Sequence, residues 1–216
     1  MSMCSLCCKS LLVQLTESSP LGGVVAHVPT EVRRRQFIDA AVTVIARVGV
    51  DGATTRRIAE EAGAPLATLH YCFQTKENLL WAVFEQLAEL TRADLKEHAD
   101  FQGQPVAAMA ALVLEDSIRW AIDNPAANKT QIEIWLWAER NDPEFAVRVY
   151  GMFIDAWKGF LRGAKTPLPE DQLETVTRVV VSLVDGLCMQ LITHGDEKLV
   201  LRELETAQAM LKAFLG

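Results

Sequence analysis

The sequence is poor in the patterns that carry catalysis. Its four histidines, at positions 27, 70, 98 and 194, are scattered and form no His-Glu-x-x-His metal motif. No glycine-rich phosphate loop is present, and no serine sits in a nucleophile elbow followed by an acid and a histidine. We therefore expect neither an enzyme nor a bound cofactor or metal.

Long apolar runs and a basic N-terminus are also missing. No uninterrupted apolar stretch approaches the roughly 18 to 20 residues that a membrane-spanning helix needs. Lys9 is the only basic residue before Arg33, whereas a secretory signal opens with a positive segment. Cys72 and Cys188 stand alone in helical patterns, as reduced cysteines do. We expect a cytoplasmic protein with no membrane partner.

Residues 1–29 lack a sustained period and include SSPLGG, so we expect a disordered or loosely attached extension. Within it, Cys4, Cys7 and Cys8 form a C-x-x-C-C cluster. Such a cluster could bind zinc or copper with a further ligand, or respond to oxidants. Because the second ligand pair of a closed zinc site is missing, we assign no metal, and the segment could equally never fold.

Charge is distributed unevenly along the chain. The net charge is −7, which alone argues against a polyanionic partner. Residues 31–76, however, hold seven basic and five acidic side chains, whereas residues 77–216 carry a net charge of −9. A mildly basic head on an acidic body favours a head that binds nucleic acid.

Apolar residues recur at three- and four-residue spacing almost throughout, and no strand period competes with them. The sequence therefore predicts an all-α fold: a three-helix head over residues 30–76 and a helical bundle over residues 77–216. The expected helices span 31–48, 54–63, 65–73, 76–98, 105–124, 126–140, 143–163, 170–193 and 197–214.

Two short helices flank Gly63, a candidate for a left-handed helix stop. Thr54 or Thr55 can cap the first, Pro65 suits the first turn of the second, and Thr75 can cap the long helix that follows. Braced by the preceding helix, this arrangement is typical of a helix-turn-helix that inserts its second helix into the DNA major groove. Alternatively, the three helices merely pack against the body.

The segment from about Arg34 to Leu80 closely resembles the DNA-binding head of the tetracycline-repressor (TetR) family of bacterial transcription regulators. The positions that match the family pattern are Thr54, Thr55, Ile58, Ala59, Gly63, Thr68, Leu69, Tyr71, Phe73, Lys76, Glu77, Leu79 and Leu80. His70 stands where the family usually has Tyr, and Cys72 where it usually has an aromatic residue or His.

The resemblance implies a double-stranded DNA operator as partner. It assigns phosphate contacts to Thr55, Thr68, His70, Tyr71 and Lys76. Base edges would face Arg56, Leu66 and Ala67. An arginine can read guanine with two hydrogen bonds, whereas leucine and alanine can only favour a thymine methyl group or exclude bulk.

Large adaptable side chains and a few carboxylates mark the middle helices as a candidate pocket for a small-molecule effector. Trp135 and Trp137 are two residues apart and cannot share a helical face, so one could line a cavity while the other packs elsewhere. Asp185 could also face a cationic or hydroxylated ligand, although such carboxylates are more often solvated. The candidates are Met109, Asp116, Trp120, Glu133, Trp135, Trp137, Met152, Phe153, Trp157 and Met189.

In the resembling family the last two helices pair with their copies in a homodimer, which brings two heads to a palindromic operator. Gly186 would permit close approach between helices. The alternative is that these apolar positions form a core face within one chain. The interface candidates are Leu173, Val176, Val180, Leu183, Val184, Leu187, Leu201, Leu204 and Leu211.

These features together predict a ligand-responsive transcriptional regulator, a repressor released from its operator by a small apolar or amphipathic effector. An alternative interpretation is a helical small-molecule carrier whose head contacts protein rather than DNA.

Overall fold

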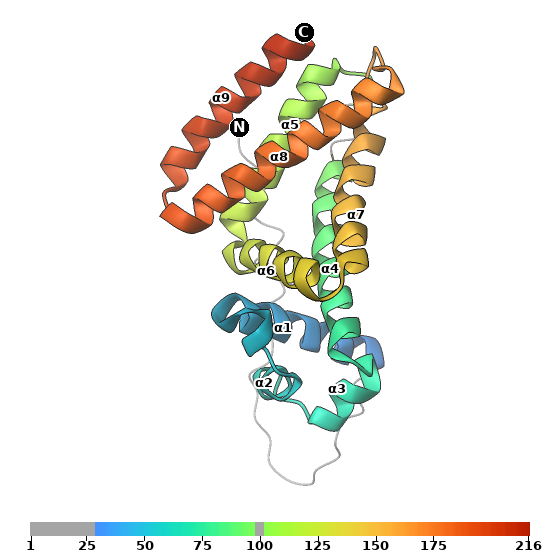
Figure 1. Ribbon diagram of the computed structural model, residues 1–216, viewed down its shortest axis with the longest axis vertical. Coiled ribbons are helices and arrows are strands. Elements are labelled where there is room, and N and C mark those ends of the chain that lie inside the picture. The colour runs from blue at the N-terminus through green and yellow to red at the C-terminus, as the bar shows by residue number, and fades with distance from the viewer. Residues whose placement is uncertain (1–28, 98–101) are drawn as a thin grey trace, which may run out of the picture.

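The computed structural model describes residues 29–97 and 102–216, the side chains of 90–97 excepted, and this part contains nine α-helices and no strand (Figure 1). Cys4, Cys7 and Cys8, as well as His98, lie outside the described residues. The helices are α1 Thr30–Gly52, α2 Thr55–Glu61, α3 Leu66–Phe73, α4 Lys76–Glu97, α5 Val106–Asp123, α6 Pro125–Asn141, α7 Pro143–Leu161, α8 Glu170–His194 and α9 Glu197–Leu215. The all-α prediction is confirmed.

Local signals place the short helices of the head. Thr54, rather than Thr55, caps α2: its hydroxyl accepts a hydrogen bond from the Arg57 N–H at 3.2 Å. Gly63 has a φ of +59°, the left-handed conformation that favours glycine after a helix. The Thr75 hydroxyl caps α4 by accepting from the Asn78 N–H at 3.1 Å. Gly63 thus sets the turn between α2 and α3, and the two caps fix where α2 and α4 begin.

The apolar face of α1 forms the centre of the head. Phe37 is fully buried and meets Phe73 of α3 edge to face, with ring centroids 6.3 Å apart. Leu69 of α3 is 1% exposed in the same cluster. Gly49, with a φ of +72°, interrupts α1 directly after the expected end of this helix at residue 48, and one further helical turn follows. The inner face of the short α3 thus packs against α1.

The head is not separated from the body by a linker. The hydrophobic cluster of the head continues into α6 and α7 through Ile134, Ala138 and Val149. α6 lies across the top of α1, as Figure 1 shows, and the Thr130 hydroxyl donates to the Val42 carbonyl at 3.1 Å. α6 and α1 are therefore in direct contact through both apolar packing and this hydrogen bond.

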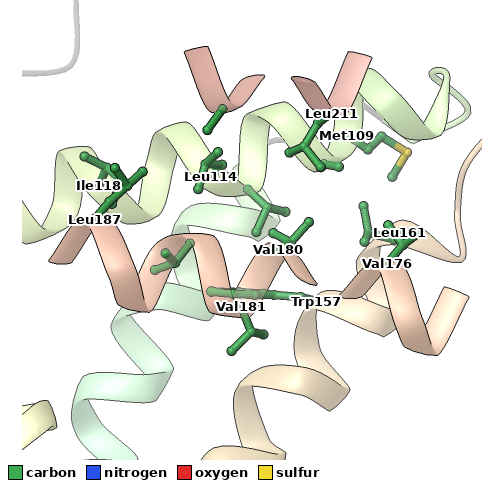
Figure 2. Packing of buried hydrophobic residues seen from close by; sticks show 14 of the residues in the cluster. Met109, Leu114, Ile118, Trp157, Leu161, Val176, Val180, Val181, Leu187 and Leu211 are labelled. Atoms are coloured by element: carbon green, nitrogen blue, oxygen red, sulfur yellow. The ribbon is translucent and has the colours of Figure 1, made fainter. Parts of the chain in front are cut away.

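A second cluster forms the core of the body between α5, α7, α8 and α9 (Figure 2). Met109 and Leu114 of α5, Trp157 of α7 and Val180 of α8 all lie inside it. Among the described helices, α8 is long and apolar enough to cross a membrane, although Arg178 and Asp185 interrupt its apolar run, in line with the lack of a long uninterrupted apolar stretch in the sequence. In the fold it is a helix of the body core.

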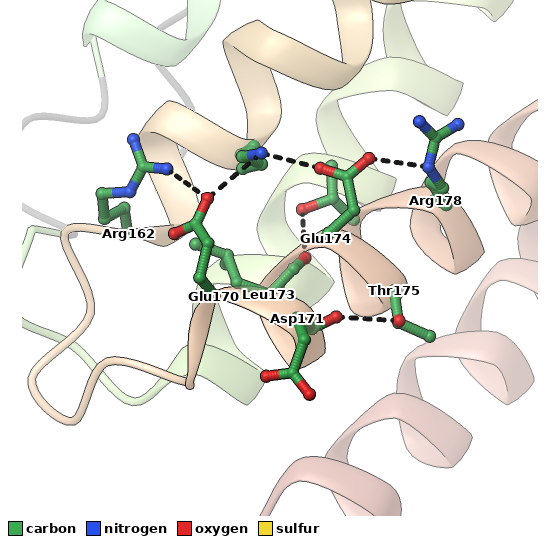
Figure 3. Close-up of polar contacts among 9 residues, drawn as sticks. Arg162, Glu170, Asp171, Leu173, Glu174, Thr175 and Arg178 are labelled. Atoms are coloured by element: carbon green, nitrogen blue, oxygen red, sulfur yellow. Dashed lines mark hydrogen bonds and ion pairs between the residues drawn. The ribbon is translucent and has the colours of Figure 1, made fainter.

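A polar network joins the end of α7 to the start of α8 (Figure 3). The Lys158 ammonium lies 2.7 Å from a Glu174 oxygen and 3.2 Å from a Glu170 oxygen. Arg162 and Arg178 pair with the same two carboxylates. Hydrogen bonds from Lys158 lower the pKa of both carboxyl groups, and those bonds raise the pKa of Lys158. The Lys158–Glu174 pair is half-buried and the Arg162–Glu170 pair is exposed, and such pairs contribute little to stability compared with the buried core.

Candidate functional site

α3 turns one face inward and presents the other to solvent. Leu69 and Phe73 are buried, whereas Tyr71 is 79% and Leu66 37% exposed. Ala67 and His70 are also exposed, and Thr68 is half-buried. The predicted base-facing and phosphate-facing residues of α3 thus lie on an accessible face of a helix that is anchored from behind. Contact with DNA by these residues stays a prediction.

α2 contributes the adjacent basic side chain. The Arg56 side chain is 81% exposed, and its Nε donates to Glu60 Oε1 of the same helix at 3.1 Å. Such an exposed ion pair is weak and easily exchanged for a nucleic-acid contact. Thr55 is half-buried at the N-terminus of α2.

Lys76 already has a partner in the protein. Its ammonium donates to the Val50 carbonyl at 2.6 Å, and burial lowers its pKa. This hydrogen bond ties the start of α4 to the turn that follows the break in α1. An ammonium has three N–H donors, so two remain for the predicted phosphate contact.

Arg34 supports α3 in a way that sequence reasoning missed. Its Nη1 donates to the Cys72 carbonyl at 2.8 Å, and its guanidinium lies 4.5 Å from the centroid of the Phe73 ring. Burial raises the pKa of the Cys72 thiol. Cys72, where the sequence departs from the family pattern, thus has a half-buried, protonated side chain. Arg34 binds the backbone carbonyl of this residue.

A cavity of about 280 Å³ opens within the body, between α4, α5, α6, α7 and α8. Aromatic side chains dominate its walls, and few polar groups interrupt them. The lining residues are Phe84, Ser117, Trp120, Asn128, Gln131, Ile132, Trp135, Tyr150, Phe153, Trp157, Val181, Val184, Asp185, Cys188 and Met189. This composition is typical of a small-molecule site.

Five of the ten predicted ligand residues line this cavity, and a ligand contact by them remains a prediction. Trp135 lines it while Trp137 packs against the head cluster, so the two diverge as their spacing requires. The five that line the cavity are Trp120, Trp135, Phe153, Trp157 and Met189.

The other five predicted ligand residues do not line the cavity. Met109 is fully buried in the body core, and Met152, like Trp137, packs against the head cluster. Glu133 is turned toward α1, where its Oε2 lies 3.2 Å from the position a Cβ would take on Gly49. Asp116 is half-buried outside the lining. Helical spacing identified large side chains on these helices, but it could not tell which of their faces borders a void.

The polar groups of the cavity were mostly missed. The Tyr150 hydroxyl donates to Asp185 Oδ2 at 2.5 Å, and burial raises the pKa of both groups. Burial also raises the pKa of the Cys188 thiol, to about 12, so it lines the cavity as a protonated, weakly polar group. Asn128, Gln131 and Trp135 share one stripe of α6, a spacing that could have revealed the two amides.

Most of the predicted dimer residues belong to the core of a single chain, which corrects their assignment to the interface. Leu183 and Leu201 are half-buried against the same core. α8 and α9 are apolar on both faces, so residue spacing alone did not distinguish the buried positions from the exposed ones. The fully covered residues are Leu173, Val176, Val180, Val184, Leu187, Leu204 and Leu211.

The apolar side chains that α8 and α9 leave exposed are different ones: Val179, Met189 and Ile192 on α8, and Met210 and Phe214 on α9. Gly186 follows Val179 by seven residues and therefore lies on the same side of α8 as that exposed side chain. A Cβ added at Gly186 would meet no atom within 4 Å. Packing within the chain therefore does not explain this glycine.

Within residues 29–97 and 102–216, no group of three or more His, Cys, Asp and Glu side chains is arranged to hold a metal ion. The proposed cysteine cluster near the N-terminus lies outside these ranges.

Comparison with known proteins agrees with this geometry. Residues 37–83 match the family model described as "Bacterial regulatory proteins, tetR family". The chain is 32% identical to the HTH-type nicotine-responsive transcriptional repressor HdnoR of Paenarthrobacter nicotinovorans, over 76% of this chain and 86% of that protein. It is 28% identical to the HTH-type transcriptional regulator BetI of Cronobacter sakazakii, over 85% of this chain and 89% of that protein.

A solved structure of a TetR-family member from Streptomyces coelicolor superimposes with a TM-score of 0.65 at 25% identity, covering 81% of this chain and 96% of that one. The match extends through both head and body. The chain belongs to the tetR family of bacterial regulatory proteins, and it is a ligand-responsive, DNA-binding transcriptional regulator.

Proposed function

We propose that the protein is a homodimeric repressor that binds a palindromic operator and leaves it when a small molecule occupies the cavity of the body. The observation that carries this proposal is the anchored α3, whose outer face presents the predicted DNA-contacting residues beside Arg56. We infer that it acts in the cytoplasm, where operator DNA is accessible.

A second copy of the chain completes the DNA-binding unit in this proposal. The exposed apolar residues of α8 and α9, together with Gly186, form the surface we assign to the dimer contact. A single head with a formal charge of only +2 over residues 31–76 attracts phosphate weakly. Two heads joined by a two-fold contact engage successive half-sites and read a palindrome.

α6 supports a link between cavity and head. Asn128, Gln131 and Trp135 line the cavity, whereas Thr130 and Ile134 of the same helix face α1 and the head cluster. A ligand that fits better when α6 is displaced favours a different placement of the heads. The ligand lowers operator affinity by at most the factor by which it binds that state more tightly than the other.

The effector is a small organic molecule in this proposal. HdnoR, 32% identical to this chain, is described as nicotine-responsive. That likeness supports a compact effector for the cavity, and the identity of the effector for this chain is open to experiment.

Selection from a pool of random DNA duplexes, with the purified protein at a stated salt concentration, tests the proposal. We expect enrichment of a palindrome with half-sites about one helical turn apart, or at a somewhat longer spacing. If a folded, dimeric protein enriches no sequence at moderate salt, DNA regulation is overturned and a small-molecule carrier becomes the better explanation.

Arg56→Ala is expected to relax the preference at one base pair of each half-site. Loss of a bidentate guanine contact costs roughly 1 to 3 kcal/mol of discrimination. The measurement is repeated selection with the variant, with Arg47→Ala as control, because Arg47 is an exposed arginine of α1 paired with Glu61. Unchanged base preference in Arg56→Ala would exclude this residue from base reading.

A further inference from the structure

The cavity of the body has a single charged group. Asp185 is the only Asp, Glu, Lys, Arg or His among its lining residues. Within the described part of the chain, Asp185 forms no ion pair, and its carboxylate accepts a hydrogen bond from the Tyr150 hydroxyl at 2.5 Å. The neighbouring Arg178 is engaged with Glu174 at 2.7 Å. The cavity therefore has, at a position that is also exposed to solvent, a carboxylate with which no described basic side chain pairs.

Aromatic rings line the same cavity as this carboxylate. Tyr150, which binds Asp185, also lies against Trp135, with ring centroids 5.9 Å apart and planes inclined by 38°. Phe153 and Trp157 form a second pair at 5.9 Å in the same lining. The faces of such rings carry partial negative charge and attract cations within about 6 Å. The carboxylate and the aromatic rings thus both favour a positively charged ligand.

Two unpartnered donors lie on α6. Nδ2 of Asn128 and Nε2 of Gln131 are buried without a hydrogen-bond partner among the described residues, and both side chains line the cavity. Asn128 is only 3% exposed, so solvent scarcely reaches it. A buried donor without a partner costs free energy, and a ligand atom that accepts its hydrogen bond removes that cost.

We propose that the effector is a monovalent organic amine: its protonated nitrogen binds Asp185 beside the Trp135 and Tyr150 rings, its flat apolar body fills the aromatic walls, and an acceptor atom meets the amides of α6. This inference rests on the proposed function only in taking the cavity as the effector site. At about 280 Å³, the cavity is just below the roughly 300 to 1,000 Å³ usual for ligand sites, which suits a ligand of one or two rings. An anionic ligand meets no basic side chain there.

Three probes of nearly equal shape test the charge preference: para-methoxyphenethylamine, the corresponding alcohol and the corresponding carboxylate. Their affinities for the full-length protein are measured by calorimetry without DNA, and quenching of the cavity tryptophans gives a second readout. We expect the amine to bind on the order of 10- to 100-fold more tightly than the alcohol, and the carboxylate to bind more weakly still. Equal affinities of amine and alcohol, or no amine binding at millimolar concentration, would overturn the inference.

Two variants locate the groups responsible. In Asp185→Asn, the amine and the alcohol are expected to bind with about equal affinity, and the affinity for the alcohol should not change. The substitution removes the charge and keeps the shape of the side chain. Asp155→Asn, which changes an exposed carboxylate of α7 outside the lining, is the control and should keep the preference. Unaltered thermal unfolding confirms that both variants fold. A preference that survives in Asp185→Asn contradicts the assignment.

Gln131→Leu tests the other end of the ligand. In the parent protein the methoxy compound should bind more tightly than phenethylamine, which lacks the acceptor, and the variant should lose that advantage. An advantage that persists in Gln131→Leu overturns the role of the α6 amides.

Operator binding separates this inference from the proposed function. If the amine binds through Asp185 yet leaves operator affinity unchanged, the proposed release mechanism fails and the ligand class stands. If operator selection succeeds but the three probes bind alike, the ligand class alone is wrong.

Discussion

Gly186→Glu is expected to convert the dimer into monomers and to lower operator affinity by roughly 100- to 10,000-fold, the gain that linked binding sites usually provide. Gly186 lies on the exposed side of α8, where nothing in the same chain comes within 4 Å of an added Cβ. The monomer should therefore tolerate the change, and a helix interior favours glutamate over glycine by somewhat less than about 1 kcal/mol. In a two-fold contact the new side chain adds both bulk and repulsion between like charges.

Sedimentation velocity gives the oligomeric state of this variant, and fluorescence anisotropy with the selected operator gives its affinity. Gly159→Glu on α7 is the matched control, since Gly159 is also an exposed helical glycine with no atom within 4 Å of an added Cβ. That variant should remain dimeric and bind normally. A dimeric Gly186→Glu protein would show that the contact lies elsewhere.

Leu69→Ala is expected to destabilise the head by about 2 to 5 kcal/mol, the usual cost of removing a buried leucine side chain, and to abolish operator binding. Leu69 is 1% exposed and, with Phe73, forms the inner face that holds α3 on α1. α3 has only eight residues and cannot persist as a helix without this packing. The DNA-facing side chains would then lose their common orientation.

Thermal unfolding monitored by circular dichroism and operator binding at a temperature below the transition measure the two effects. Leu66→Ala is the control for stability, because Leu66 is 37% exposed on the outer face and should affect DNA contact more than folding. Leu69→Met keeps the volume and should retain most stability and binding. An unchanged unfolding midpoint in Leu69→Ala would contradict the anchoring role.

The helix-turn-helix was accessible from the sequence because its determinants are local. Thr54, Gly63 and Thr75 act within a few residues of their own positions, through capping hydroxyls and a left-handed backbone. The resemblance of this segment to a known family rests on the same short-range pattern. Element boundaries in the body were likewise marked by Pro, Gly, Asn and Asp.

The cavity was only half accessible from the sequence. The divergence of Trp135 and Trp137 follows from helical geometry, yet which of the two would meet a void depends on how α6 rests on α1. Tyr150 and Asp185 come from helices α7 and α8, and their hydrogen bond has no signal in either segment alone. Asn128 and Gln131 share a helical stripe with Trp135, but the lack of partners for their amide nitrogens becomes apparent only in the packed structure.

By itself the sequence determined the helices, their order, the DNA-binding head and the family, since periodicity, caps and turn residues act over short distances. Tertiary structure alone decided which apolar face of α8 and α9 is covered by the chain, leaving Val179 and Phe214 exposed while Leu173 and Val180 are buried. It also decided which charged side chain lines the cavity, because Asp185 becomes the one charged residue among the described lining residues only when five helices pack together. Burial is a property of packed helices, and a helix that is apolar on two sides does not record which side its own chain will cover.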